Sequence, residues 1–240
     1  ETVIGGKTVR MGGIAKGSGM IHPNMGTMLC FLTTDCAISS EMIKSALLET
    51  VQVSFNRISV DGDTSTNDSC IVLANGLAGN AEITEQGADY QAFTEALMTL
   101  CTELARKMAA DGEGATRLVT VHVAGAATDA DADAAARTIA NSPLVKTAIY
   151  GHDANWGRIA AAAGRSGAAF RQEDVSIDIM GMPVCRGGLT VAFDEEEALR
   201  RFEAPEIAID VNLGAGTCET TMWTCDFSHD YVTINGDYRT

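Results

Sequence analysis

The chain has 240 residues, 46% of them hydrophobic, and its 17 basic and 32 acidic residues give a net charge of −15 at pH 7. This length and apolar content are sufficient for a globular core in one large or two small domains. The negative charge argues against nucleic acid and anionic membrane as partners, because both would be repelled, and no apolar run approaches the ~18 residues of a membrane span; small polar substrates are expected instead.

The seven cysteines and four histidines predict neither a disulfide framework nor a metal centre. The cysteine count is odd, no C-x-x-C pair occurs, and most of the cysteines lie in apolar surroundings, as is typical of buried thiols in a reducing compartment. The histidines lack the i,i+4 spacing of a metal-binding helix. Glu1 begins neither a natural start nor a signal peptide, so we expect a processed or truncated cytoplasmic product without a cofactor or structural metal.

Residues 2–14 read as strand, Gly5-Gly6 turn and strand, which predicts a β-hairpin. The hairpin leads into residues 16–35, KGSGMIHPNMGTMLCFLTTD, where glycines and Pro23 interrupt an apolar run and constrain the backbone. Residues 28–32 then predict a short buried strand. Thr27 is therefore expected where a shaped loop enters the core.

This position suits a threonine that cleaves its own chain. If the Thr27 hydroxyl attacks the Gly26 carbonyl, an N-to-O acyl shift followed by hydrolysis releases Thr27 as a new N-terminus. Its α-amine, with a reference pKa near ~7.7, can then act as the base for its own hydroxyl. The other interpretation is a Gly-Thr turn before a strand, since turn chemistry selects the same residues.

Between this strand and residue 112 the sequence predicts two helices, a third strand and an acidic loop. Residues 39–55 and 88–110 carry apolar side chains at helical spacing, with Ser39 or Ser40 as the first N-cap and Gly112 as the second helix stop. Residues 70–75 form a continuous apolar run of buried-strand length. For the acidic loop 61–68 we favour a hydrogen-bonded turn network over a metal site, because the glutamate that ends a calcium loop is missing.

The second half is predicted to be rich in β-structure. Strands are expected at residues 117–124, 144–150, 175–180, 189–193, 206–211, 217–227 and 231–234, with 217–227 at a sheet edge. Helices are expected after Thr128, after a cap at Asp153 or Asn155, and over residues 194–202, and His152 is assigned to structure. These elements indicate an α/β (α+β) fold in which helices cover mixed sheets, with a smaller C-terminal lobe from about residue 130.

Five stretches of the sequence together carry a resemblance to a known family. In chain order they are GGIAKGSGMIHPNMGTML, FNRISVDGDTSTND, DGEGATR, GHDANWGRIAAA and DYVTINGDYRT. They resemble the glutamate N-acetyltransferase/ornithine acetyltransferase family of arginine biosynthesis, and the resemblance runs over residues 4–240. The family more often has alanine in place of Gly26, which exchanges one small residue for another.

The resemblance implies a self-processing N-terminal-threonine acyltransferase architecture with layered helices and sheets. Cleavage between Gly26 and Thr27 would make residues 1–26 the end of an α segment and residues 27–240 a β chain that begins with the nucleophile. It also implies that the partner is the α chain of the same precursor, in a heterotetramer of two α and two β chains. The oxyanion hole would come from a threonine–glycine pair of the α chain, upstream of Glu1.

The matched motifs also imply an activity and a set of contacts. Thr27 would take the acetyl group of N2-acetylornithine and pass it to glutamate by a ping-pong route, and acetyl-CoA is an alternative donor in some members of the family. Lys16, Glu113, Asn235 and Thr240 match the family's substrate contacts. We infer that Lys16 and Glu113 hold the α-carboxylate and α-amine regions common to both substrates, since one carboxylate cannot serve both side chains.

Two rival functions stay open on the sequence alone. An N-terminal-threonine amidase or peptidase would use the same nucleophile with water as the acceptor. A non-catalytic binding or assembly domain would keep Gly26–Thr27 as an ordinary turn. Product analysis separates the first rival from an acetyltransferase, and the absence of both cleavage and an acyl adduct would favour the second.

Overall fold

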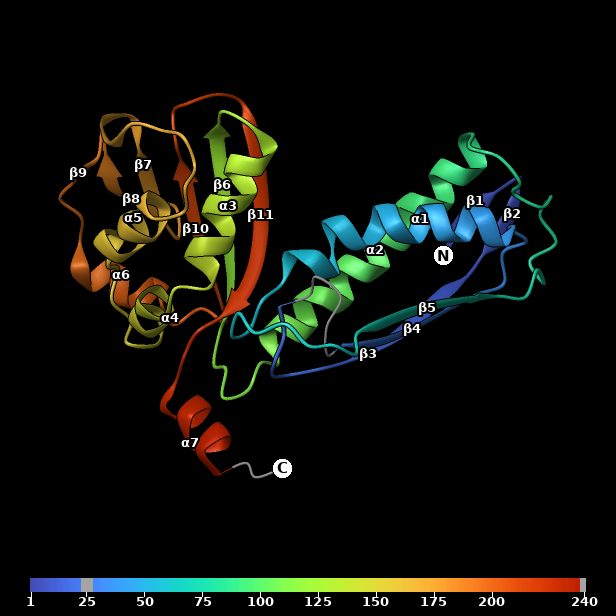
Figure 1. The fold of residues 1–240 in the computed structure, drawn as a ribbon, viewed down its shortest axis with the longest axis horizontal. Helices are drawn as coiled ribbons and strands as arrows, with labels where there is room; N and C mark the ends of the chain where they lie inside the picture. The colour runs from blue at the N-terminus through green and yellow to red at the C-terminus, as the bar shows by residue number, and fades with distance from the viewer. Residues whose placement is uncertain (23–27, 238–240) are drawn as a thin grey trace. The chain divides into compact units, whose positions relative to one another are not determined.

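The computed structural model describes residues 1–22 and 28–237 of the chain. Its contacts divide into two compact units, Glu1–Ile58 with Gly62–Met108, and Ser59–Asp61 with Ala109–Thr240. The second unit begins earlier in the chain than the lobe expected from about residue 130, because strand β6 (Leu118–Ala126) lies inside its sheet. Figure 1 shows the elements of each unit.

The first unit contains a three-stranded sheet in the order β3-β4-β5. Strand β4 (Leu29–Thr34) pairs antiparallel with β3 (Met11–Lys16) and parallel with β5 (Ser69–Ala74). A hairpin of β1 (Thr2–Ile4) and β2 (Lys7–Val9) precedes the sheet. Gly5 and Gly6 have φ angles of 54° and 74° at its turn, as a two-residue hairpin turn requires. The hairpin turn and the two later strands of this unit are confirmed, but the stretch predicted as the second strand of the hairpin is divided into β2 and β3, which belong to different sheets.

Two helices cover one face of this sheet (Figure 1). They are α1 (Ser40–Val53) and α2 (Ala88–Ala110), and a 3-10 turn, η1 (Phe55–Arg57), follows α1. Ser39 caps α1 by accepting a hydrogen bond from a first-turn amide. On the covered side β4 buries Cys30 and Leu32. A Cβ at Gly13 of β3 would lie 3.1 Å from Leu104 of α2, so strand and helix pack closely there.

The second unit contains a six-stranded sheet in the order β11-β6-β10-β7-β8-β9. Its other strands are β7 (Ser176–Ile179), β8 (Met182–Arg186), β9 (Leu189–Thr190), β10 (Glu206–Asn212) and β11 (Cys218–Cys225). β6 and β10 are parallel, and the other pairs are antiparallel. The predicted edge position of the 217–227 strand is confirmed. β8 has no counterpart among the predicted strands, because Pro183 is typical of a strand break.

Helices α3 (Asp129–Ala140) and α5 (Trp156–Gly164) pack against this sheet with small residues. The buried alanines of α3, Ala132, Ala135 and Ala136, bring its backbone close to β6 and β11. Thr128 caps α3 and Asn155 caps α5, each through a side-chain oxygen that accepts a first-turn amide. Both predicted helices are therefore confirmed, with Asn155 rather than Asp153 as the cap.

Residues 144–150 form a helix, so the strand predicted there is wrong. Helix α4 (Pro143–Tyr150) begins with Ser142 as its N-cap, and Pro143 occupies the first turn. Proline at this position costs no hydrogen bond and has a φ angle already suited to a helix. These start signals outweigh the β-propensity of the valine, isoleucine and threonine that follow.

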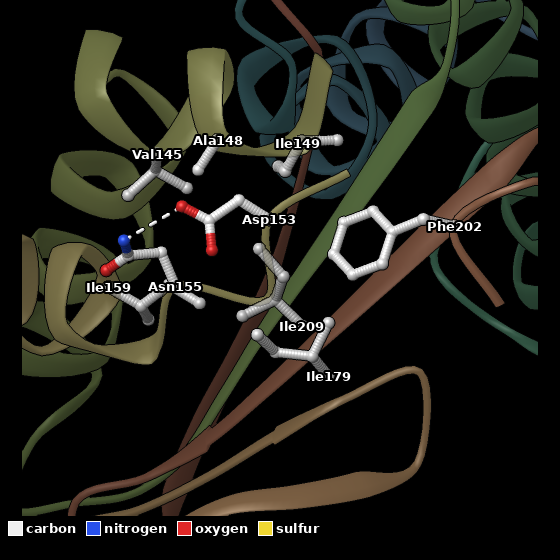
Figure 2. A pocket seen from close by; sticks show the side chains of 9 residues that line it. All are labelled: Val145, Ala148, Ile149, Asp153, Asn155, Ile159, Ile179, Phe202 and Ile209. Atoms are coloured by element: carbon white, nitrogen blue, oxygen red, sulfur yellow. Dashed lines mark hydrogen bonds between the residues drawn. The ribbon is translucent and has the colours of Figure 1, made fainter. Parts of the chain in front are cut away.

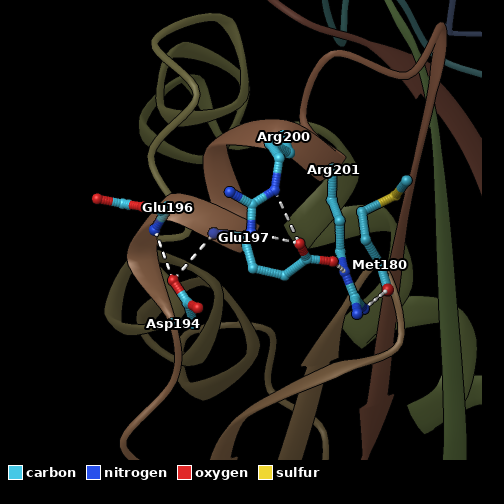
Figure 3. A network of polar contacts seen from close by, with 6 residues as sticks. All are labelled: Met180, Asp194, Glu196, Glu197, Arg200 and Arg201. Atoms are coloured by element: carbon cyan, nitrogen blue, oxygen red, sulfur yellow. Dashed lines mark hydrogen bonds and ion pairs between the residues drawn. The ribbon is translucent and has the colours of Figure 1, made fainter.

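The predicted helix over residues 194–202 is confirmed as α6 (Glu195–Arg201) with Asp194 as its cap. Figure 3 shows the Asp194 carboxylate accepting the amides of Glu196 and Glu197 at 2.9 and 3.0 Å. The Glu197 carboxylate in turn pairs with Arg201 and Arg200, which lower its pKa. Because these charges are solvated, the network stabilises the helix only modestly.

The predicted strand at residues 231–234 is also wrong, because α7 (His229–Asp237) occupies this part of the chain. The Ser228 hydroxyl accepts the Asp230 amide at 3.1 Å at the start of the helix. The rings of Phe227 and Tyr231 stack with centroids 4.5 Å apart. A helix satisfies its backbone groups internally, whereas a strand here would need a partner strand.

Candidate active site

The predicted cleavage pair, Gly26 and Thr27, lies outside the described residues, but the chain on both sides of residues 23–27 is held by one loop. The Asp68 carboxylate accepts the backbone amide of Met28, and the Thr64 hydroxyl donates to the His22 carbonyl at 3.1 Å. The acidic loop 61–68 therefore forms hydrogen bonds next to the Thr27 segment, as the turn-network interpretation predicts. No metal-binding cluster of acidic, histidine or cysteine side chains occurs among the described residues.

Lys16 is placed beside the start of the strand that follows Thr27. It is the last residue of β3 and lies opposite Leu29 in the antiparallel register with β4. Both side chains are exposed on the same face of the sheet. The Lys16 amine is thus accessible near the point where β4 begins.

Glu113 lies on a short loop between α2 and β6, with a constrained glycine on each side. A Cβ at Gly112 would lie 2.8 Å from the Cys225 sulfur, so only glycine fits without a shift. Gly114 has a φ of 69°, and a Cβ there would lie 2.5 Å from the backbone nitrogen of Tyr231. The glycines let the loop pack tightly against the end of β11 and the start of α7.

Asp226 and Ser228, which follow β11 in the chain, hold the Glu113 loop in place through hydrogen bonds. The buried Asp226 carboxylate accepts the amides of Thr116 at 2.7 Å and Arg117 at 3.0 Å, and also the Thr116 hydroxyl at 2.5 Å. The Ser228 hydroxyl donates to the Gly114 carbonyl at 2.5 Å. Sequence reasoning missed both residues; Ser228 alone carries a local signal, because serine is a preferred residue at the start of a helix, whereas the partners of Asp226 lie more than a hundred positions away.

Helix α7 brings Asn235, a second predicted site residue, to the Glu113 loop. The Asn235 side-chain amide donates to the Glu113 carboxylate at 2.9 Å and to the Tyr231 carbonyl at 3.0 Å. The structure therefore brings Glu113 and Asn235 together within the second unit, whereas Lys16 belongs to the first. Thr240 lies outside the described residues.

An aromatic hollow of about 330 Å³ lies beside the same helix. Its lining includes Thr147 and Tyr150 of α4, and Phe227, His229 and Tyr231 at the start of α7. Tyr150 and His229 meet edge to face with ring centroids 5.6 Å apart. The hollow has the size of a small-molecule site, and α7 connects it to the Glu113 loop.

A second cavity is too small to bind a substrate (Figure 2). Its volume is about 10 Å³, enough for one water molecule. Within its lining the Asn155 amide donates to the Asp153 carboxylate at 2.9 Å. Neighbouring His152 stacks on Phe202 with ring centroids 6.2 Å apart, a packing contact that agrees with the structural role expected for it.

Most of the cysteines are weak competitors for the role of nucleophile. All seven are free thiols. Hydrogen bonding to Cys70 and burial raise the pKa of Cys30, and burial raises the pKa of Cys101 to about 12 and that of Cys36 to about 11. Because the thiolate is the reactive form, Cys30, Cys36 and Cys101 stay unreactive at neutral pH, whereas the hydrogen bond with Cys30 lowers the pKa of Cys70.

One fully buried lysine supports the end of β11. The Lys146 ammonium donates to the Thr224 hydroxyl at 2.7 Å and to the Cys225 carbonyl, and lies 4.5 Å from the centre of the Phe227 ring. Burial lowers the pKa of Lys146, and nearby Cys225 and Asp226 oppose this shift. The lysine ties α4 to the segment that carries Asp226.

Comparison with known proteins identifies the family. The ArgJ family model matches residues 1–240. This chain belongs to the ArgJ family. It is 53% identical over 237 residues to the arginine biosynthesis bifunctional protein ArgJ of Symbiobacterium thermophilum, and the match covers 99% of this chain and 59% of that protein. The ArgJ of Geobacillus stearothermophilus is 50% identical over 240 residues, with 58% of its length covered.

The fold agrees with this membership in the ArgJ family. The crystal structure of the arginine biosynthesis bifunctional protein ArgJ from Bacillus halodurans matches with a TM-score of 0.83 and 45% identity, covering 87% of this chain and 98% of that chain. The expected α/β class with helices and mixed sheets is thus confirmed. This chain spans less than two thirds of the length of the curated ArgJ proteins it matches.

Proposed function

We propose that this chain carries the nucleophile of an acetyltransferase that moves the acetyl group of N2-acetylornithine to glutamate in arginine biosynthesis. Two observations support the proposal. The relatives are named bifunctional arginine biosynthesis proteins. The structural observation that carries it is the hydrogen bond between Glu113 and Asn235, two residues that match the family's substrate contacts and come from distant parts of the chain.

The proposal includes self-cleavage between Gly26 and Thr27. The hydrogen bonds of Thr64 and Asp68 support it, since they restrain the backbone before and after this segment and so favour one geometry for attack of a hydroxyl on the preceding carbonyl.

Acetyl transfer then proceeds in two steps through an ester on Thr27. The α-amine of Thr27 takes the proton of its own hydroxyl, the oxygen attacks the acetyl carbonyl, and ornithine leaves with a proton. The α-amine of glutamate next attacks the acetyl ester, which releases N-acetylglutamate and restores the threonine. Both tetrahedral intermediates need donors to a negatively charged oxygen, and the resemblance assigns these donors to the α segment.

Lys16 and Glu113 each bind a different charged part of the substrate in this proposal. The Lys16 ammonium suits the α-carboxylate, and the Glu113 carboxylate suits the α-amine region, through charge-assisted hydrogen bonds. Asn235 orients the Glu113 carboxylate by occupying one of its oxygens. Thr240 completes the set on the strength of the motif alone. Acetyl-CoA is retained as a second acetyl donor, and no cofactor is part of the proposal.

The proposed assembly contains two α and two β chains, and its proposed location is the cytoplasm. Seven free cysteines, five of them buried, support a reducing compartment. Among the described residues, no helix has both the length and the apolar character needed to cross a bilayer.

Product analysis tests the function directly. The processed chain, supplied with the remaining part of its precursor, is incubated with N-acetylornithine with and without glutamate. Formation of N-acetylglutamate and ornithine in equal amounts, dependent on glutamate, is the expected result. Release of acetate at the same rate with and without glutamate would establish an amidase instead. N-terminal sequencing of the same sample tests whether a chain begins at Thr27.

A further inference from the structure

One face of the first unit's sheet is apolar and exposed. We call it the outer face and define it by Ile14, Leu29, Phe31, Ile71 and Leu73. Ile14, Phe31 and Ile71 are register partners across β3, β4 and β5, so they form one continuous row. Ile14 is 71% exposed and Leu73 is 61% exposed. Contiguous apolar patches of this kind mark interaction surfaces, whereas single exposed apolar side chains do not.

Among the described residues, helices cover one face of this sheet but not the outer face. Helices α1 and α2 lie against the opposite face, and within the described part of the first unit no helix or strand lies over the outer face (Figure 1). β3 and β5 are also the edge strands of this sheet. The sheet therefore forms half of a layered core.

The sequence of the strands indicates that this half is incomplete. β4 (LCFLTT) begins with four consecutive apolar residues and β5 (SCIVLA) ends with five, so neither strand alternates strictly between apolar and polar residues. Strands that pair in parallel, as these two do, are usually buried on both faces. The sequence predicts buried strands at residues 28–32 and 70–75, yet β4 buries only alternate residues, and in β5 only Cys70 and Val72 are half-buried while the other residues are exposed. The difference is explained if a further layer covers the outer face.

We propose that the outer face is the docking surface for the part of the precursor that lies outside these 240 residues. The matched relatives support this occupant, because this chain accounts for only 58–59% of their length. The docking segment must present an apolar face, since a charge set against the row of Ile14, Phe31 and Ile71 would be buried without a partner. The inference rests on the proposed function, which requires an α segment.

The docking also has a consequence for the substrate site. Lys16 lies on the outer face, two residues beyond Ile14 on the same strand. A segment that covers the outer face therefore closes over the Lys16 amine and excludes water from it. The substrate-binding site is then incomplete until the segment is bound.

A binding assay tests this inference separately from activity. All chains carry Thr27→Ala, so that neither cleavage nor turnover affects the result, and the remaining part of the precursor is co-expressed with an affinity tag. Leu73→Lys places a charge on the outer face. Leu48→Lys is the matched control, because Leu48 lies on α1 in the same unit and is 56% exposed. We expect Leu73→Lys to reduce recovery of the chain by about tenfold or more and Leu48→Lys to leave it unchanged.

Folding and self-association are measured on the chain alone. Because Leu73 is exposed, the midpoint of denaturation of Leu73→Lys should equal that of the parent chain. Ile14→Lys provides a second variant on the same face with the same expected result. Equal recovery of parent and Leu73→Lys chains would overturn the inference. A dimer of the isolated chain that Leu73→Lys abolishes, without loss of segment binding, would also overturn it, because the occupant would then be a second copy. Normal segment binding by a chain that keeps Thr27, combined with no acetyl transfer by that complex, would instead contradict the proposed function.

Discussion

The side-chain amide of Asn235 donates a hydrogen bond of 2.9 Å to the carboxylate of Glu113, although 122 residues separate them in the chain. Their backbones are held independently of this bond. The Glu113 loop is anchored by Asp226, and Ser228 links Gly114 to the start of α7. Glu113 is therefore oriented by the tail of its own chain.

The Glu113–Asn235 pair is expected to act as a unit in catalysis. Glu113→Ala and Asn235→Ala should each lower kcat/KM for acetyl transfer by about ten- to a hundredfold or more, which corresponds to the roughly 1.5–3 kcal/mol of a charge-assisted hydrogen bond. The double variant should lose little more than Glu113→Ala, because the two changes remove the same contact. Steady-state kinetics of all four forms measure the coupling. Strictly additive losses would show that the residues act separately.

The end of the tail is expected to serve the site rather than the fold. Deletion of residues 236–240 removes no buried apolar side chain of the described residues, so folding and cleavage should be retained while acetyl transfer falls sharply. The measurement is transfer from N-acetylornithine to glutamate by the processed, deleted enzyme with its α segment. Wild-type rates would remove Thr240 from the site.

Gly114 is expected to control how closely α7 approaches the Glu113 loop. Gly114→Ala combines strain at a φ of 69° with a Cβ only 2.5 Å from the Tyr231 nitrogen. Gly167→Ala is the matched control, because its φ is 84° and nothing lies within 4 Å of its Cβ position. The control should lose about 1 kcal/mol of unfolding free energy from backbone strain alone. Gly114→Ala should lose more and also lose transferase activity. If Gly114→Ala and Gly167→Ala changed the free energy of unfolding and the transferase activity by equal amounts, the contact between Gly114 and Tyr231 would have no special role.

Processing is expected to depend on Thr27 and, through the backbone, on Asp68. In a full-length precursor Thr27→Ala should remain a single chain, and Thr27→Ser should cleave slowly because a hydroxyl is retained. Asp68→Ala removes the acceptor of the Met28 amide and should slow cleavage, whereas Asp68→Asn keeps an oxygen acceptor and should restore much of the rate. Mass spectrometry of the chains over time follows the reaction. Cleavage of the Thr27→Ala precursor at this bond would refute the mechanism.

Lys146 is expected to make stability depend on pH. Burial lowers its pKa in the folded chain below the ordinary 10.5, so the unfolded chain holds more protons between the two values, and stability rises with pH across that range. Lys146→Met should remove this rise while leaving Thr224 without its donor. The free energy of unfolding should therefore favour wild type increasingly as the pH rises from the lowered pKa of the folded chain toward 10.5.

Lys107→Met provides the control for this pH dependence, because Lys107 pairs with Glu103 on an exposed helix surface. Its difference from wild type should not change with pH. The expectation for Lys146 fails if wild type and Lys146→Met differ by the same free energy of unfolding at every pH.

Elements whose signals are local could be predicted from the order of the amino acids. Helices α1, α2, α3, α5 and α6 follow from apolar periodicity and cap residues such as Ser39, Thr128 and Asp194, because a helix satisfies its hydrogen bonds within a few residues. The same reasoning failed for α4 and α7, where β-branched and aromatic residues suggested strands. Local start signals at Ser142, Pro143 and Ser228 decided the outcome.

Which distant groups meet could be seen only in the folded chain. Nothing in the local pattern of Asp226 or Gly114 indicates that one anchors the Glu113 loop and the other admits α7, since these contacts join residues more than a hundred positions apart. Motifs named Glu113 and Asn235 as site residues, but their hydrogen bond depends on how β11 directs the chain past the loop. Such contacts arise from long-range packing, which side-chain periodicity and propensity do not encode.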